Sequence, residues 1–310
     1  MAKYSYLSTG LSSGIGGAAR PSIESSHPEL YHIMLCRNPH KFSTSKNTTA
    51  IKVDLGSIES VRDALAEVKT LLENGNVPPL KYVLNNAGAQ YKTRAIKTRE
   101  GYEITFQVNV IAPFLIILTM LPYLRKVHEP RVFVTGSFVH FADDEHAHGW
   151  VPPMYWNEND VRELMLPNKT KVDPDPEAPE AGKRANAISK LAVIYLVHKF
   201  ARDNQEIKFV VYHPGYVASS GLYNSMDTKT KIVIKLTGGL CRLMGWATTV
   251  SKAGANLAKN AFDENLYSKV NNVAYVDQGD ITRSSHESYN EKREQKLWNE
   301  LLKCVATGEK

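Results

Sequence analysis

A glycine-rich turn near the start of the chain has the residue types and spacing of a phosphate-binding loop. The segment Thr9-Gly10-Leu11-Ser12-Ser13-Gly14-Ile15-Gly16 follows an apolar, strand-like run and leads into Gly17-Ala18-Ala19. Such glycines permit a tight turn and let backbone N–H groups approach a pyrophosphate at the positive end of a helix. Glycine clusters are common in turns, but here strand, turn and next strand have the spacing of a nucleotide-binding unit. Pro21 would interrupt the helix that follows unless that helix is short or kinked.

The residues that close the second predicted strand indicate which dinucleotide is bound. An acidic side chain there bonds a free ribose 2′-hydroxyl, whereas an arginine accommodates a 2′-phosphate. The sequence is Leu35-Cys36-Arg37-Asn38, with one guanidinium and no carboxylate. We therefore expect NADPH in preference to NADH, although most arginines are simply solvated surface charges.

Short β-branched or aromatic runs alternate with helical patterns along the chain, which is typical of βαβ units and a parallel sheet. Ser57 is a candidate N-cap for one helix, and another helix is predicted after Thr249. The predicted strands are residues 4–9, 31–36, 50–55, 81–84, 131–135, 208–212 and 273–276. The apolar run 111–124 contains two prolines and is too short to span a membrane, so we predict a buried core helix.

The composition excludes several classes of protein. The 310 residues include 38 basic and 32 acidic side chains, a net charge of +6, and 43% are apolar, as in ordinary globular proteins. No run of Lys and Arg interleaved with aromatic residues indicates a nucleic-acid face. The surplus of positive charge favours an anionic small molecule instead.

Several motifs occur in the order found in the short-chain dehydrogenase/reductase superfamily, over about residues 3–280. The glycine turn resembles that family's cofactor turn, and Val53-Asp54-Leu55 resembles the segment whose acidic residue meets the adenine. Asn85-Asn86-Ala87-Gly88 resembles the end of the family's fourth strand. His213-Pro214-Gly215-Tyr216-Val217-Ala218-Ser219 resembles the loop that holds the nicotinamide.

The Cys36-Arg37-Asn38 signature and residues 275–302 look most like the branch that contains retinol dehydrogenases and protochlorophyllide reductases. The resemblance implies one NADP-binding domain over residues 1–310. Its fold would be an α/β, Rossmann-type, doubly wound parallel sheet with strand order 3-2-1-4-5-6-7. The cofactor-binding residues that it implies are Gly10, Ser12, Ser13, Ile15, Gly16, Arg37, Asp54, Leu55, Asn86, Ala87, Gly88, Lys190, Pro214, Gly215, Val217 and Ser219.

Asn109, Ser137 and Lys190 stand where the family keeps its active-site asparagine, serine and lysine. The family reduces carbonyls with a Tyr-x-x-x-Lys pair, in which tyrosine gives the proton and lysine holds the nicotinamide ribose. Here Asn186 stands four residues before Lys190. The resemblance implies that Asn109 supports Lys190 through water and that Ser137 and Asn186 hydrogen-bond the substrate. The alternatives are a turn-capping hydroxyl for Ser137 and a surface position for Lys190.

An asparagine amide cannot release a proton near neutral pH, and a positioned acid contributes about 10²–10⁴-fold to a rate. Three hypotheses remain open. The substrate needs no proton, as with an iminium carbon; another side chain donates; or redox chemistry is lost and the pocket orients a polycyclic substrate for isomerisation or cyclisation. We predict an NADPH-dependent short-chain reductase with a non-standard proton donor, an oxidoreductase acting on an apolar small molecule such as an iminium or a polycyclic compound. The alternatives are a non-redox isomerase or cyclase that retains NADP(H) and a non-catalytic NADP-binding sensor. Family members in fungal natural-product pathways look similarly altered, which suggests secondary metabolism. The candidate donors are His140, Asp143, Asp144, His146, His148, Tyr155 and Tyr216.

A literal Tyr-x-x-x-Lys occurs at residues 195–199, but Tyr195 lies nine positions after Asn186 and so faces the other side of the helix. We interpret it as packed core.

Two segments interrupt the alternation of strands and helices. Residues 138–182 are rich in acidic side chains, His and Pro, and within them 173–180 are predicted to be an exposed loop. Residues 219–246 are predicted to be a substrate lid; its part 228–246 also fits a helix on a membrane surface or, preferably, an amphipathic helix packed on its own domain. The His and Asp residues near 140–148 have no zinc spacing, so no metal site is predicted.

Cys36, Cys241 and Cys304 are odd in number and far apart, which favours a reducing compartment. No secretion signal is recognised, and the expected location is the cytoplasm. We expect a small-molecule substrate and no nucleic acid; a homodimer and a peripheral membrane contact are left open.

Overall fold

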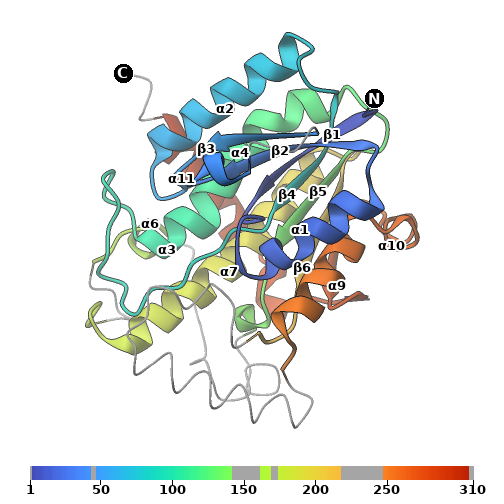
Figure 1. Cartoon of the computed structure of the whole chain (residues 1–310). Coiled ribbons are helices and arrows are strands. Elements are labelled where there is room, and N and C mark those ends of the chain that lie inside the picture. The colour runs from blue at the N-terminus through green and yellow to red at the C-terminus, as the bar shows by residue number, and fades with distance from the viewer. Residues whose placement is uncertain (1, 43–46, 142–160, 169–173, 218–246, 307–310) are drawn as a thin grey trace.

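A sheet of eight strands carries helices on both of its faces in the computed structural model of the protein (Figure 1). The structure describes residues 2–42, 47–141, 161–168, 174–217 and 247–306. The strands are β1 (Tyr4–Thr9), β2 (Leu30–Cys36), β3 (Thr48–Lys52), β4 (Leu80–Asn85), β5 (Arg131–Thr135), β6 (Lys208–His213), β7 (Val273–Asp277) and β8 (Asp280–Thr282). The helices are α1 (Gly14–Ser26), α2 (Ile58–Glu73), α3 (Ile104–Phe106), α4 (Ala112–Leu124), α6 (Val161–Leu164), α7 (Pro179–Asp203), α9 (Val250–Phe262), α10 (Glu264–Ser268) and α11 (Glu291–Ala306). Shorter helical turns are η1 (Pro39–Lys41), η2 (Gln107–Ile111), η3 (Phe138–His140) and η5 (His286–Tyr289).

The strand order is β3-β2-β1-β4-β5-β6-β7-β8, and the first seven strands in chain order are parallel. The predicted order 3-2-1-4-5-6-7 is therefore confirmed. The sequence interpretation missed β8, which pairs antiparallel with β7. Gln278 and Gly279 join the two strands with positive φ angles of 52° and 130°, as a two-residue hairpin turn requires. All three residues of β8 are exposed, so no apolar alternation marks it.

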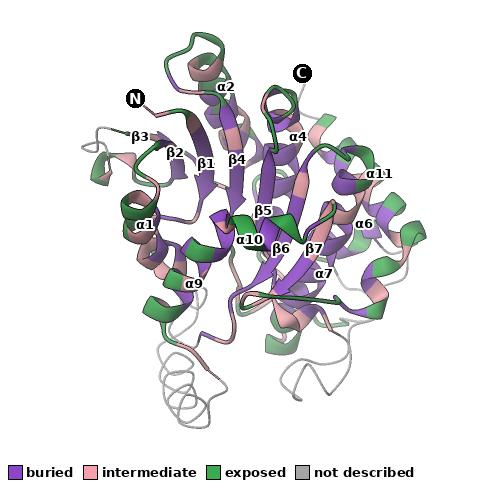
Figure 2. Cartoon of the chain, turned by 90° about the vertical axis from the view of Figure 1, so that its right-hand side faces the viewer, coloured by how far each residue is buried: buried purple, intermediate pink, exposed green. Residues whose placement is uncertain are grey.

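Each face of the sheet carries its own apolar core. One core lies under α2, α4, α7 and α11, and the other lies under α1, α9 and α10. Figure 2 shows the buried strands between the two helical layers. Burial on both faces explains why the central strands are almost continuously apolar.

The predicted helix starts are confirmed by their caps. Ser57 Oγ accepts a hydrogen bond from Ser60 N (3.2 Å) at the start of α2, and Thr249 Oγ1 accepts one from Lys252 N (3.1 Å) at the start of α9. α1 continues through Pro21 to Ser26, so it is longer than that proline suggested. On the α9 side, a Cβ at Gly254 would lie 2.7 Å from Ala18 Cβ, which shows how closely α1 and α9 pack.

Two sequence expectations about helices have different outcomes. Among the described residues, Ile104–Leu124 is long and apolar enough to cross a membrane, but 83% of its most apolar stretch is buried in the protein, as expected of a core helix. The prediction of an exposed loop over residues 173–180 was wrong for its last two residues, because α7 begins at Pro179. Proline is tolerated in the first turn of a helix, where its missing N–H would have no helical partner. The predicted lid, residues 219–246, lies outside the described residues.

Candidate active site

The glycine turn and the end of β4 approach too closely to admit side chains. Gly10 has a φ of 72°, and a Cβ on it would lie 2.5 Å from the backbone nitrogen of Ala87. A Cβ on Gly16 would lie 2.1 Å from Gly10 O. Ser13 precedes α1 and its side chain makes no capping hydrogen bond. The Ser13 side chain therefore does not take up the first N–H groups of α1, and phosphate binding by these groups stays a prediction.

Asn86 joins the carboxyl ends of three strands. Its Nδ2 donates to Gly10 O (3.0 Å), and its Oδ1 accepts from Thr135 Oγ1 (3.0 Å). Beside it, Ala87 N donates to Thr9 Oγ1 (3.2 Å). The structure therefore brings the predicted Asn86 and Ala87 to the glycine turn. The roles of Thr9 and Thr135 were missed, because each follows from a contact distant in sequence.

Arg37 and Asp54 are both exposed, just beyond the ends of β2 and β3, with the half-buried Leu55 next to Asp54. Tyr91 lies within electrostatic range of both charges. Burial raises the pKa of the Tyr91 phenol, Asp54 raises that pKa further, and Arg37 lowers it. Tyr91 comes from the stretch after β4, and sequence reasoning did not connect it with this end of the site. Ser12, half-buried, and Ile15 also belong to the turn at this edge of the sheet.

Lys190 is 6% exposed, so it is not the surface lysine of the alternative interpretation. Its Nζ donates to Thr135 O (2.8 Å), and burial lowers the pKa of its ammonium group to about 8. A Cβ on Gly88 would lie 3.6 Å from both Lys190 Nζ and Asn109 Oδ1. The two functional side chains thus converge beside the backbone of Gly88.

Asn109 lies in η2, a single π-helical turn between α3 and α4, a feature that often marks functional sites. Its Oδ1 accepts from Ala89 N (2.8 Å), and its Nδ2 donates to Ala89 O (3.0 Å) and to Ser189 Oγ (2.9 Å). Asn109 therefore fixes the stretch after β4 against α7. Its predicted support of Lys190 through water remains a prediction.

Asn186 lies one helical turn before Lys190 on the same face of α7 and is 5% exposed. Its Nδ2 donates to Gln90 Oε1 (3.1 Å), and its backbone oxygen accepts from Ser189 Oγ (2.6 Å). Its Oδ1 is buried and has no hydrogen-bond partner among the described residues. The contact with Gln90 could not be read from the sequence, since 96 positions separate the two residues.

Ser137 begins the turn η3, and its Oγ accepts from Val139 N (3.4 Å), so the turn-capping use of this serine is present. η3 packs against α7, which places Ser137 on the same side of the sheet as Lys190. At the end of β6, Pro214 and Val217 are buried and Gly215 has a φ of 83°. A Cβ on Gly215 would lie 2.8 Å from Gln278 Oε1. Ser219 lies outside the described residues.

The structure removes His140 from the candidate proton donors. Its Nδ1 lies 2.6 Å from Ser137 O, and its Nε2 accepts from Ser285 N (3.0 Å). A carbonyl on one side and an N–H on the other fix a neutral ring, with both nitrogens engaged. Tyr216 is half-buried, and its backbone oxygen accepts from Thr248 N (2.8 Å). The other candidates, and all of the His and Asp cluster except His140, lie outside the described residues.

His213, at the end of β6, was missed as a site residue. Its ring packs against Phe138 with a 5.3 Å centroid distance, and its buried Nδ1 has no partner among the described residues. Burial first, and then the neighbouring His140 and Lys190, lower the pKa of His213 to about 3. The imidazole is therefore uncharged at neutral pH.

Tyr195 lies in the core, as predicted. It is fully buried, and its hydroxyl donates to Glu287 O (2.6 Å). The literal Tyr-x-x-x-Lys motif at 195–199 is thus structural. The described cysteines, Cys36 and Cys304, are buried and are not disulfide-bonded.

Residues 6–146 match the family described as short chain dehydrogenase. The chain is 25% identical over 284 residues to the short-chain dehydrogenase iccH of Talaromyces variabilis, covering 81% of this chain and 78% of that protein. It is 28% identical over 235 residues to the protochlorophyllide reductase of Pisum sativum, covering 69% of this chain and 56% of that protein. The fold is shared with NADPH-bound carbonyl reductase from chicken fatty liver, at a TM-score of 0.62 and 18% identity, covering 92% of this chain and all of that one. With its parallel sheet, glycine turn and ordered motifs, the chain is similar to the short-chain dehydrogenase/reductase family, whose model matches its residues 6–146.

Proposed function

We propose that the protein is an NADPH-dependent reductase of a small, largely apolar molecule, with Asn186 in place of the usual phenolic proton donor. The observation that carries this proposal is the convergence of Lys190, Asn109 and Gly88 beside a glycine turn that has no room for side chains. A dinucleotide would lie across the ends of β1 and β4, where ligands bind in sheets of this topology.

Each residue has a separate task in this proposal. The N-terminus of α1 binds the pyrophosphate, and Arg37 binds a ribose 2′-phosphate. Lys190, whose ammonium is oriented by Thr135 O, holds the nicotinamide ribose. Ser137 and Asn186 hydrogen-bond the substrate. NADPH, when bound, supplies the hydride.

The test is a fluorescence titration of the protein with NADPH and NADH, repeated on Arg37→Ala. A charge-assisted hydrogen bond contributes roughly 1.5–3 kcal/mol, so the variant should lose about 10-fold or more in NADPH affinity and little in NADH affinity. Arg99→Ala is the matched control, because that guanidinium is 85% exposed and pairs with Glu59. If the protein bound neither NADPH nor NADH, the proposed function would be wrong.

The second candidate is a non-redox isomerase or cyclase that retains NADP(H) as part of its pocket wall. The observation in its favour is that Asn186 has no dissociable proton and that His140 is engaged at both nitrogens. Lys190→Met distinguishes the two. Product formation that persists in this variant, with the dinucleotide still bound, would favour the second candidate over hydride transfer.

A further inference from the structure

The side chain of Asn186 carries a hydrogen-bond acceptor that has no partner among the described residues. Its Nδ2 is committed to Gln90 Oε1, while its Oδ1 is buried without a partner among the described residues. A buried polar atom without a partner costs roughly 1–3 kcal/mol, so a ligand that satisfies it gains affinity. An amide oxygen can be satisfied only by a hydrogen-bond donor.

The orientation of this amide is held by its neighbours. Ser189 Oγ donates to Asn186 O and accepts from Asn109 Nδ2. Asn109 also forms hydrogen bonds with both the backbone N–H and the backbone oxygen of Ala89. Gln90, the partner of the Asn186 amide, directly follows Ala89. The acceptor oxygen is therefore part of a rigid link between α7 and the stretch after β4.

A hydrogen-bond acceptor at this position disfavours binding of a ketone, whose oxygen is itself only an acceptor. A ketone oxygen would bring its lone pairs against Asn186 Oδ1, and the amide of Asn186 has no proton to give to the alkoxide. A reacting group that carries its own proton avoids both difficulties, because the acceptor then binds it.

From these contacts we infer that the reacting group of the substrate is a protonated imine, whose N–H⁺ donates to Asn186 Oδ1. This inference rests on the proposed function. Hydride from the dihydronicotinamide adds to the carbon of C=N–H⁺, and the π electron pair becomes the nitrogen lone pair. The dihydronicotinamide is oxidised, the imine is reduced to an amine, and the nitrogen keeps its proton, so no acid is needed.

The charge of Lys190 is compatible with a cationic substrate. Its Nζ is directed at Thr135 O, one helical turn, about 6 Å along α7, from Asn186. That oxygen, and not the substrate position beside Asn186, is the hydrogen-bond partner of the Lys190 ammonium. His213 adds no charge, since its pKa lies at about 3.

The test compares three probes of similar size by calorimetry on the NADP⁺-bound protein, at a pH that protonates the imine. They are 3,4-dihydroisoquinolinium, its N-methyl iminium, which is cationic but has no N–H, and 1-tetralone, a ketone. We expect the N–H cation to bind about tenfold or more tightly than either of the others. NADPH consumption should follow the same order.

Three variants assign the preference to one atom. Asn186→Leu, which is nearly isosteric, should abolish the difference between the N–H and N-methyl cations. Asn186→Asp offers only oxygen atoms to the site and should keep or increase that difference. Asn260→Asp, the same change in a buried asparagine of α9 on the other face of the sheet, should leave it unchanged.

Each result bears on a distinct claim. Equal or undetectable affinity for the three probes, in a protein that binds NADP⁺, overturns the inference while leaving the proposed reductase standing. Loss of the N–H preference in Asn186→Asp also overturns it, because an acceptor oxygen at position 186 would then not be the source of the preference. Failure to bind NADP⁺ or NADPH overturns the proposed function itself.

Discussion

Asn186 and Lys190 lie one helical turn apart, and only the lysine can exchange a proton near neutral pH. We predict that Asn186→Tyr gains NADPH-dependent reduction of 1-tetralone, by about 10²–10⁴-fold over the unmodified protein, because a positioned acid contributes that much. The measurement is NADPH consumption at saturating dinucleotide. Asn186→Phe, which has the same ring and no hydroxyl, should show no gain. Equal rates for the two variants would mean that Lys190 is not arranged for carbonyl reduction.

Burial of Lys190 makes the stability of the protein depend on pH in a defined direction. Between about pH 8 and the ordinary lysine pKa of 10.5, the unfolded chain keeps a proton on Lys190 that the folded chain has released. Stability contributed by this residue therefore rises with pH across that window and is constant below it. We predict that the free energy of unfolding, relative to Lys190→Met, increases from pH 8 upward in urea titrations without dinucleotide. A difference that stays flat with pH would contradict the burial of this charge.

The sequence identified the residues that the family motifs contain but not the residues that hold them. Asn86, Asn109 and Lys190 were found from short motifs. Gln90 and Thr135 were missed, because their contacts with Asn186 and Lys190 span 96 and 55 positions and leave no local pattern. His140 was taken as a candidate donor because a sequence does not show that both ring nitrogens are engaged.

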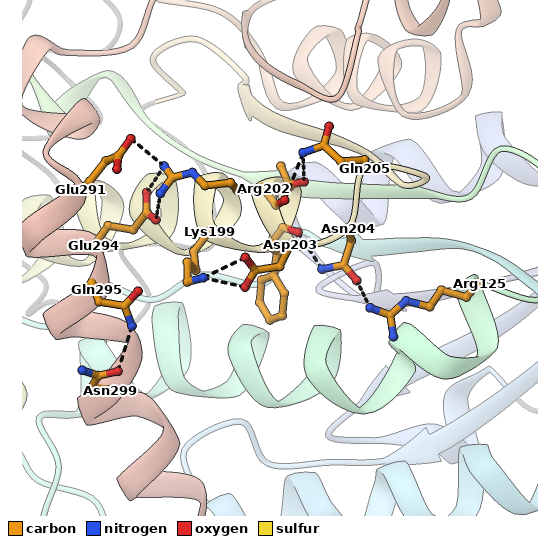
Figure 3. Close-up of polar contacts among 12 residues, drawn as sticks. Arg125, Lys199, Arg202, Asp203, Asn204, Gln205, Glu291, Glu294, Gln295 and Asn299 are labelled. Carbon is orange, nitrogen blue, oxygen red and sulfur yellow. Dashed lines mark hydrogen bonds and ion pairs between the residues drawn. The ribbon is translucent and has the colours of Figure 1, made fainter.

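The C-terminal helix α11 is attached to α7 by charges as well as by apolar contacts. Figure 3 shows Arg202 of α7 directed at Glu291 and Glu294 of α11. The fork between Arg202 and the buried Glu294 is bidentate, with N–O distances of 2.9 and 3.0 Å. Burial raises the pKa of Glu294, and Arg202 opposes that shift. This ion pair therefore helps to hold α11 against α7.

We predict that Arg202→Met lowers the free energy of unfolding by about 2 kcal/mol. This is below the roughly 3–5 kcal/mol of a fully buried pair, because Arg202 is 45% exposed. Adding Glu294→Leu should restore most of the loss, since no unpaired carboxylate then remains buried. Urea unfolding of the single and double variants gives both values. Arg99→Met, which breaks the exposed pair with Glu59, should cost less than about 1 kcal/mol.

Element types were predictable wherever burial gives a periodic pattern. All seven predicted strands are present, and their ends move by a few residues. β3 runs over Thr48–Lys52 instead of 50–55, because it is an edge strand whose register is set by pairing with β2 alone. β8 was missed because its three residues are exposed and give no apolar pattern. The start of α7 was missed because Pro179 was taken as a helix breaker, whereas it lies in the first turn of the helix, where proline is tolerated.

The molecule as a whole depends on α11 to complete one of its two cores. Trp298 packs edge-on against Phe114 of α4 and Phe200 of α7, at centroid distances of 5.1 and 4.9 Å, and Leu297 and Leu301 are fully buried. We predict that deletion of residues 291–310 abolishes cooperative thermal unfolding and drives aggregation, because the apolar faces of α4 and α7 become exposed. Light scattering during a thermal scan tests this. Deletion of 307–310 alone should have no such effect, and a soluble, cooperatively unfolding 1–290 fragment would refute the prediction.

The double engagement of His140 links the Ser137 turn to a segment outside the predicted site residues. Ser285 holds the His140 ring, while Tyr195 and His198 of α7 hold the backbone of Glu287 and Ser288 in the same turn, η5. Substitutions within residues 284–289 therefore act on the position of Ser137 through the His140 ring. For laboratory evolution, this short stretch is a place to adjust turnover or stereochemical preference while dinucleotide affinity is kept.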